Sequence, residues 1–272
     1  MIFFRRKKHK VGLALGSGSA RGLAHIGVIK ALTEEKIAID MIAGSSIGAL
    51  VGACFANGTI KDLEKVTLNM DFKNLLKLAD PQPFLLSKGF IAGKKVEELL
   101  ISLIGDVEFK DLNIPFLVAA TDAQTGDEII IKAGSVSKAV RASLSIPGVF
   151  TPAKFENRFI IDGGIASPMP VDILKREGMN FIIASNVAKK PRIRSKTVDA
   201  PYIFETIIGA IDIMGYQIVK MKLKEANMVI TPEVDQIALL EFYRGKETIE
   251  AGYKKTKEEI LRNKLKKQLR IT

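Results

Sequence analysis

The stretch IAIDMIAGSSIGALVGACFANG (37–58) joins an apolar run directly to a helix of small residues. The run predicts a buried strand over 37–44, and Gly58 predicts the end of the helix that follows. A similar pair precedes it, with VGLALG (11–16) as the strand and 23–36 as the helix. The chain therefore begins β-α-β-α, which is typical of a parallel sheet covered by helices.

Helix and strand patterns keep alternating along the rest of the chain. Helices are predicted over 60–105 (with a break at 80–83), 135–143, 170–177 and 202–226, and strands over 115–122, 128–134, 158–162, 180–185 and 226–234. No internal repeat is visible. We therefore expect a basic tail over 1–10 and a single α/β domain over 11–272, with a central, mostly parallel sheet in a three-layer α/β/α arrangement.

Positive charge gathers near the two ends of the chain. The formal net charge is +11; residues 1–10 carry five Lys or Arg and no acid, and the predicted basic helix over 254–270 carries eight basic and two acidic residues. Such segments attract anionic membranes or nucleic acid, or are simply solvated. Because no nucleic-acid motif accompanies them, we expect peripheral contact with an anionic membrane and no nucleic-acid partner.

The chain shows no membrane-spanning pattern. Its longest apolar stretch, 206–218, contains Asp212, and MIFF at the start is too short for a signal peptide. The single cysteine, Cys54, fits a reducing compartment. We expect a cytoplasmic protein, at most peripheral at the inner membrane surface.

The turn between the predicted strand and helix is a G-x-S-x-G motif, Gly44-Ser45-Ser46-Ile47-Gly48. In a strand–turn–helix context this motif forms a nucleophile elbow, in which the glycines keep side chains away from the turn and expose the serine hydroxyl. The alternative is an ordinary glycine-rich turn with an N-cap serine.

A second glycine-rich loop follows the first strand. It reads Gly16-Ser17-Gly18-Ser19-Ala20-Arg21-Gly22. Its backbone N–H groups can bind phosphate or serve as an oxyanion hole. A dinucleotide site is disfavoured, because Arg21 breaks the G-x-G-x-x-G spacing and Asp40 precedes the apolar core of the next strand.

The third motif, Asp162-Gly163-Gly164, ends the predicted strand 158–162. We expect it at the same rim of the sheet as the two glycine-rich loops. A Ser-His-Asp triad needs a late histidine, but the chain has only His9 and His25. Either Ser46 is not catalytic, or its base is a carboxylate, for which Asp162 is the natural candidate. We expect His25 to be structural.

Together and in this order, the three motifs resemble those of the patatin-like phospholipase family, in its bacterial branch. The resemblance covers about residues 11–175, including AATDAQTGDE (119–128) and RASLSIPGVFTPAKF (141–155). It implies a patatin-like fold with Ser46 as nucleophile and Asp162 as base. It also implies an oxyanion hole in the loop 16–22.

Within that loop, the resemblance leads us to expect the N–H groups of Gly18 and Ser19 as donors, with Arg21 shaping the site. The family often has an unbroken glycine run there, whereas Ser17 and Ser19 interrupt it here. A serine that had to adopt a positive φ would be strained.

The expected function is hydrolysis of fatty-acyl esters, as in a phospholipase or lysophospholipase, through an acyl-serine and without metal or cofactor. Two alternatives stay open: acyl transfer from the same acyl-serine, and a non-catalytic lipid-binding or regulatory module. The apolar segment 81–93 is either a lid or acyl-chain wall, or a piece of core.

Overall fold

The computed structural model describes residues 9–78, 93–190 and 203–269. The basic tail predicted over 1–10 and the lid or wall predicted over 81–93 lie almost wholly outside these residues. In the described part of the chain, no helix combines the length and the apolar character that a membrane crossing requires.

An eight-stranded sheet forms the middle of the molecule, in the order β5-β6-β3-β2-β1-β7-β8 with β4 paired to β3. The strands are β1 (Val11–Leu15), β2 (Met41–Ser45), β3 (Phe116–Asp122), β4 (Glu128–Ile131), β5 (Ala153–Phe155), β6 (Arg158–Ile161), β7 (Phe181–Ser185) and β8 (Met228–Ile230). Five strands, β1, β2, β3, β7 and β8, pair in parallel, whereas β4, β5 and β6 join through antiparallel pairs.

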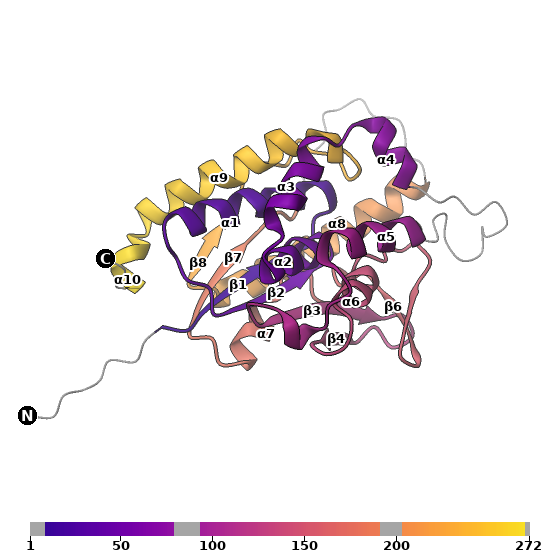
Figure 1. Cartoon of the computed structure of the whole chain (residues 1–272), viewed down its shortest axis with the longest axis horizontal. Helices are drawn as coiled ribbons and strands as arrows, with labels where there is room; N and C mark the ends of the chain where they lie inside the picture. Colours follow the sequence, from indigo (N-terminus) through magenta and orange to yellow (C-terminus); the bar gives the residue numbers. More distant parts are fainter. Residues whose placement is uncertain (1–8, 79–92, 191–202, 270–272) are drawn as a thin grey trace, which may run out of the picture.

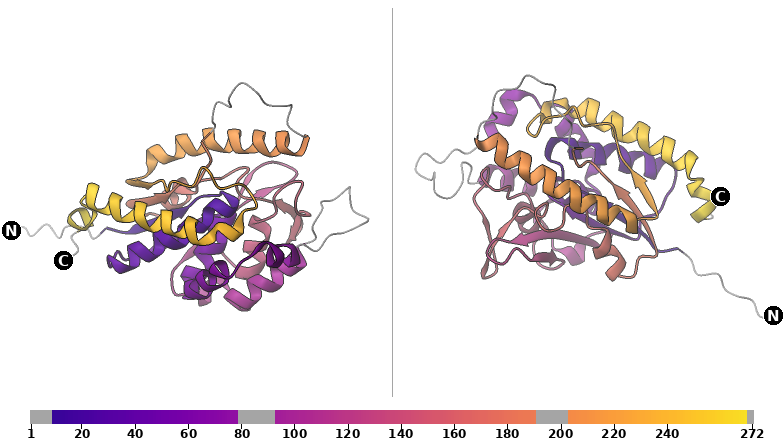
Figure 2. Two further views of the ribbon diagram at one scale, coloured as in Figure 1. Left: turned by 90° about the horizontal axis from the view of Figure 1, so that it is seen from above. Right: turned by 180° about the vertical axis from the view of Figure 1, so that it is seen from behind.

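Helices cover both faces of this sheet (Figure 1). They are α1 (Ala24–Glu34), α2 (Ile47–Asn57), α3 (Ile60–Leu68), α4 (Phe72–Leu78), α5 (Lys94–Ile104), α6 (Val136–Ser143), α7 (Val171–Arg176), α8 (Ile203–Lys222), α9 (Gly245–Arg262) and α10 (Leu265–Leu269). Short 3₁₀ helices occur at η1 (Ser19–Leu23), η2 (Phe109–Asp111), η3 (Leu223–Glu225) and η4 (Phe242–Arg244). Figure 2 shows α8 on the opposite side of the sheet from α2, α3 and α5.

The strands bury both faces, as their continuous apolar runs predict. In β1, Leu13 and Leu15 pack into the core shared with α1, α2 and α9, whereas Ala14 packs with α7 and Val219 of α8. The other central strands alternate in the same way, because successive side chains of a strand point to opposite faces. The prediction of a three-layer α/β/α fold is thus confirmed.

Three details differ from the predictions. The second strand begins at Met41 rather than at residue 37, because Asp40 is used to join its start to β1: its carboxylate accepts the N–H of Val11 at 2.7 Å. The short strand β5 carries too little pattern to be predicted from sequence. Finally, β6 runs antiparallel to β3, so the rim argument for Asp162 assumed the wrong strand direction.

Candidate active site

Ser46 lies in the sharp turn between β2 and α2. Its φ of +54° is in the left-handed region that non-glycine residues rarely occupy, as expected of a strained elbow. The turn packs so closely on β1 that a Cβ on Gly48 would lie 2.2 Å from the carbonyl oxygen of Leu15. A Cβ on Gly44 would lie 2.5 Å from the carbonyl oxygen of Gly48, so both motif glycines are required by space.

The hydroxyl of Ser46 donates a hydrogen bond to Oδ2 of Asp162 at 2.5 Å. The other carboxylate oxygen, Oδ1, accepts the N–H of Gly164 at 2.6 Å. Both side chains are buried, and this desolvation raises the pKa of Asp162 to about 6, although the hydrogen bonds from Ser46 and Gly164 oppose the shift. The carboxylate is therefore a stronger base than an exposed aspartate and is still ionised at neutral pH.

Asp162 reaches Ser46 although β6 is antiparallel to β3, because β6 pairs with β3 only at Thr121 and Asp122, the carboxyl end of β3. The hydroxyl of Thr121 donates to the carbonyl oxygen of Asp162 at 2.8 Å. Gly163 then passes over β3 so closely that a Cβ would lie 2.1 Å from the carbonyl oxygen of Ala119. The short overlap places the aspartate at the same rim as the elbow.

Ser143, the last residue of α6, connects nucleophile and base. Its Oγ accepts the N–H of Ser46 at 2.8 Å and donates to Ala119 O at 2.6 Å. Its carbonyl oxygen accepts the N–H of Gly163 at 3.2 Å, and that of Ser145 accepts the N–H of Asp162 at 2.9 Å. The sequence prediction missed both serines, since a lone serine in a helical pattern carries no signal for this role.

The glycine-rich loop 16–22 lies between β1 and α1. The amide of Gly16 donates to Ser185 O at 3.2 Å, and that of Ser17 donates to Pro168 O at 2.9 Å. Within the described residues, no hydrogen bond of the protein uses the amides of Gly18 and Ser19, which line the same hollow as Ser46. These two amides are therefore the loop's available donors for an oxyanion.

Ser19 has a φ of +50°. This is the strained backbone conformation that was expected if a serine of this loop had to adopt a positive φ. The C-terminal part of the chain holds it there. Its hydroxyl donates to the carbonyl oxygen of Leu239 at 2.6 Å, and the amide of Ala20 donates to the same oxygen at 3.2 Å. Ser17, the other serine in the loop, has no positive φ.

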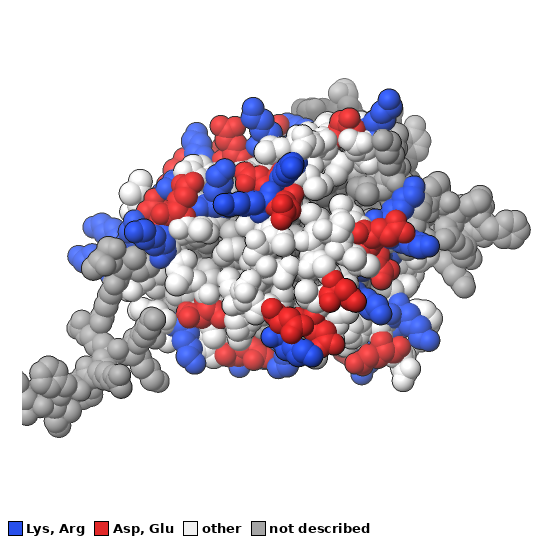
Figure 3. All heavy atoms as spheres, viewed as in Figure 1, with Lys and Arg blue, Asp and Glu red and all other residues white. Residues whose placement is uncertain are grey.

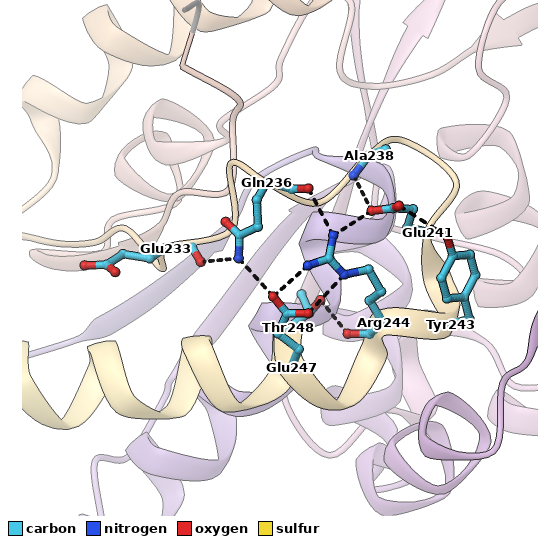
Figure 4. Close-up of polar contacts among 8 residues, drawn as sticks. All are labelled: Glu233, Gln236, Ala238, Glu241, Tyr243, Arg244, Glu247 and Thr248. Atoms are coloured by element: carbon cyan, nitrogen blue, oxygen red, sulfur yellow. Dashed lines mark hydrogen bonds and ion pairs between the residues drawn. The ribbon is translucent and has the colours of Figure 1, made fainter.

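The segment that carries Leu239 is itself fixed by hydrogen bonds around Arg244 (Figure 4). The guanidinium donates to the carbonyl oxygen of Gln236 at 3.1 Å and pairs with Glu241 at 2.9 Å and Glu247 at 2.8 Å. We call this group the Arg244 cluster. It ties the turn over 236–241 to the start of α9.

Arg21 is buried at the base of the loop. Its Nε donates to Val187 O at 3.2 Å, and its guanidinium pairs with Asp212 of α8 at 3.4 Å. From the sequence, Asp212 was notable only as a charge that interrupts an apolar stretch. The structure shows that it pairs with the buried Arg21. Gly22 lets the loop approach α2, since a Cβ there would lie 2.0 Å from the side chain of Ile47.

His25 is fully buried behind the loop, as a structural residue. Its Nε2 lies 2.9 Å from Gly16 O, so this nitrogen donates, and Nδ1 accepts from the hydroxyl of Ser185 at 2.7 Å. Burial lowers its pKa to about 4, against the opposing bond to Gly16, so the ring is neutral at physiological pH.

Two hollows meet at Ser46. A hollow of about 70 Å³ lies toward α8; we call it the polar hollow because Arg21, Asp162, Lys189 and Asp212 line it, although Ile208, Ile211 and other apolar residues line it too. An apolar cavity of about 430 Å³ lies toward α2, α3, α4 and α5. Ser46, Ser19 and Ile146 line both.

A comparison with family models identifies a patatin-like phospholipase match over residues 13–175. The chain belongs to the patatin-like phospholipase family. The match ends before β7. The residues that hydrogen-bond to the side chains of His25, Arg21 and Ser19 from the C-terminal part of the chain therefore lie outside the matched region. The resemblance seen in the three motifs is thereby confirmed.

Individual relatives agree with this assignment. An uncharacterized NTE family protein of Mycobacterium tuberculosis is 39% identical over 162 residues, which is 60% of this chain and 44% of the relative. The neuropathy target esterase of Drosophila melanogaster is 33% identical over 193 residues, 67% of this chain and 13% of that protein. A lysophospholipase of Pyricularia oryzae is 28% identical over 90% of this chain and 18% of its own length. The chain spans less than half the length of these relatives.

Among solved structures, VipD from Legionella pneumophila superposes with a TM-score of 0.54 at 15% identity, covering 93% of this chain and 67% of VipD. At this identity the likeness concerns the fold alone. It agrees with the three-layer architecture.

Proposed function

We propose that this protein hydrolyses carboxylic esters of fatty acids through an acyl-enzyme on Ser46, with Asp162 as its general base. The observation that carries the proposal is the buried 2.5 Å hydrogen bond from Ser46 Oγ to Asp162 Oδ2. A serine hydroxyl is a weak nucleophile unless an adjacent base accepts its proton. Membership in the patatin-like phospholipase family supports a lipid ester as the substrate.

In the first step, Ser46 Oγ bonds to the ester carbonyl carbon while its proton passes to Asp162. The negative charge that develops on the carbonyl oxygen is stabilised by the amides of Gly18 and Ser19. Removing one such donor typically costs about 3–4 kcal/mol in the barrier. The bond to the alcohol then breaks, and the alcohol oxygen takes the proton from Asp162.

Deacylation repeats this sequence with water. Asp162 accepts a proton from the water whose oxygen attacks the acyl carbon, the bond to Ser46 breaks, and the proton returns to Ser46 Oγ. A pKa of about 6 suits both roles, because the carboxylate is ionised at neutral pH and still holds a proton briefly.

The test is hydrolysis of p-nitrophenyl esters and a panel of acyl lipids, combined with a fluorophosphonate probe. We expect labelling of Ser46 and release of fatty acid, both lost in Ser46→Ala. Labelling with acyl transfer to an added alcohol but no release of fatty acid would indicate a transferase. The absence of any labelling would indicate a non-catalytic lipid-binding module.

A further inference from the structure

We propose that the apolar cavity holds the acyl chain of the substrate and that the polar hollow holds its alcohol part. The inference rests on the proposed function and assigns a direction to the ester in that site. It follows from which residues line each hollow, where the base lies, and which walls are buried.

The two hollows differ in whether charged side chains line them. Apart from Ser19, Ser46 and Thr67, the described side chains that line the 430 Å³ cavity are all hydrocarbon, aromatic or thioether. No charged residue is among them. The polar hollow contains Arg21, Lys189 and Asp212 beside apolar residues such as Ile208 and Ile211. An acyl chain gains from transfer into the first environment, whereas a hydroxylated or charged alcohol does not.

The position of Asp162, the proposed base, independently indicates the same orientation of the ester. In the proposed mechanism, Asp162 must protonate the oxygen of the leaving alcohol. Asp162 lines the polar hollow but not the apolar cavity. The alcohol therefore leaves from the polar side. The acyl chain, on the other substituent of the carbonyl carbon, extends into the cavity.

Exposure shows how the cavity is oriented. Part of its wall is buried, with Ile47, which follows Ser46 in sequence, at 3% and Leu63 of α3 at 4% exposed. Phe72 and Leu240, which also line it, are 61% and 51% exposed. The cavity thus leads from the nucleophile to the surface between α4 and the turn before η4, and the methyl end of the chain points there.

The wall at this opening is held in place. Leu240 lies within the turn that the Arg244 cluster fixes (Figure 4). Next to it, the ring of Tyr243 contacts that of Phe72 edge-to-face, with centroids 6.3 Å apart. The same turn that supports Ser19 through Leu239 therefore also forms part of the acyl cavity.

Paired substitutions on one helix test the assignment. Val66 of α3 and Leu99 of α5 are half-buried and line the cavity, whereas Leu68 and Ile101 of the same helices are 50% and 45% exposed and do not. Val66→Trp and Leu99→Trp fill the cavity from α3 and from α5. Leu68→Trp and Ile101→Trp add the same bulk outside it.

The readout is the ratio of kcat/KM for p-nitrophenyl laurate to that for the butyrate. Each buried methylene contributes about fourfold to binding, so the loss of two lowers the ratio about fifteenfold. We expect this fall in Val66→Trp and Leu99→Trp and no change in Leu68→Trp and Ile101→Trp. Ile208→Trp, which narrows the polar hollow, should alter the preference for alcohol size and leave the chain-length ratio unchanged.

A binding assay keeps the test independent of turnover. In Ser46→Ala protein, displacement of a fluorescent fatty acid by laurate should weaken about fifteenfold with Val66→Trp but not with Leu68→Trp. The direction of the ester is overturned if both cavity variants keep the wild-type ratio and the wild-type laurate affinity. It is also overturned if Ile208→Trp, rather than the two cavity variants, lowers the laurate-to-butyrate ratio and the laurate affinity. Laurate binding without any ester hydrolysis would reject the proposed function and retain the acyl cavity.

Discussion

At the scale of single residues, the candidate chemistry depends on a carboxylate that is buried. Desolvation raises the pKa of Asp162 to about 6, and the hydrogen bonds from Ser46 and Gly164 only partly oppose this. We expect the rate of ester hydrolysis to fall as the pH decreases through about 6, because the protonated acid cannot accept the Ser46 proton. A pH–rate profile of kcat/KM measures this, and a flat profile from pH 8 to pH 5 would contradict it.

The same burial predicts that Asp162 destabilises the fold. The pKa of Asp162 is higher in the folded state, at about 6, than the ordinary value of 3.8 expected in the unfolded state. Ionising this carboxyl group therefore costs more in the folded protein, and the resulting loss of stability is complete above about pH 6. Asp162→Asn keeps Oδ1 for the Gly164 amide and removes the charge. We expect it to raise the free energy of unfolding by about 1–3 kcal/mol at pH 8.

This gain should shrink as the pH falls from 6 toward 4, because the folded wild type then becomes neutral as well. Chemical denaturation at pH 8 and pH 4 measures it, with Asp106→Asn, at an exposed position, as the control. Equal or lower stability of Asp162→Asn at pH 8 would show that the buried carboxylate carries no such cost.

At the scale of elements, close helix packing supports the sheet behind the site. The helices α1 and α9 cross where both have glycines: a Cβ on Gly27 would lie 1.9 Å from Ile249 O, and one on Gly252 would lie 2.0 Å from Ala24 O. Neither contact can be relieved by a rotamer change, since the obstacle is backbone. The element that carries His25 therefore depends on α9.

We predict that Gly252→Ala destabilises the protein by about 1–3 kcal/mol, because α9 must move away from α1. Gly209→Ala in α8 is the matched control, because no atom lies within 4 Å of its added Cβ. It should instead stabilise by about 0.5–1 kcal/mol through the higher helix propensity of alanine. Thermal melts distinguish the two, and a stable Gly252→Ala would refute the close crossing.

The elements also show what the sequence could and could not predict. The elbow at Ser46, the loop 16–22 and Asp162 were recognisable because each is a contiguous motif whose chemistry needs that spacing. The groups that support them, such as Ser143 and Leu239, are single residues far away in sequence. Leu239 acts through its backbone carbonyl, which no side-chain pattern reveals. The antiparallel direction of β6 could not be predicted, because a short strand carries the same apolar pattern whether parallel or antiparallel.

At the scale of the whole molecule, the distribution of charge differs from what the segment 254–270 indicated. Lys257 pairs with Glu35 at 2.5 Å and Glu34 at 3.3 Å, and Lys266 pairs with Glu35 at 2.6 Å. In Figure 3 acidic and basic side chains are accordingly interspersed along the rim formed by α1 and α9. The predicted basic helix is interrupted, since α9 ends at Arg262 and α10 begins at Leu265. Part of the positive charge of this segment thus neutralises the acidic end of α1.

Contact with an anionic membrane through 1–10 and 254–270 remains a prediction. We expect deletion of 1–10 to lower the binding to vesicles that contain anionic lipid, and added salt to weaken what remains. Lys257→Gln should have a smaller effect on binding, because this lysine already has acidic partners. Vesicle flotation measures both, and binding that neither salt nor the deletion changes would contradict the electrostatic account.

The central claim is that Ser46 carries the acyl group while Asp162 moves the proton. The most direct measurement is mass analysis of the Ser46 peptide after brief reaction with p-nitrophenyl laurate and an acid quench. We predict an added lauroyl mass on Ser46 in the wild type and none in Asp162→Asn. A lauroyl group on another residue, or wild-type acylation of Ser46 in Asp162→Asn, would contradict the account.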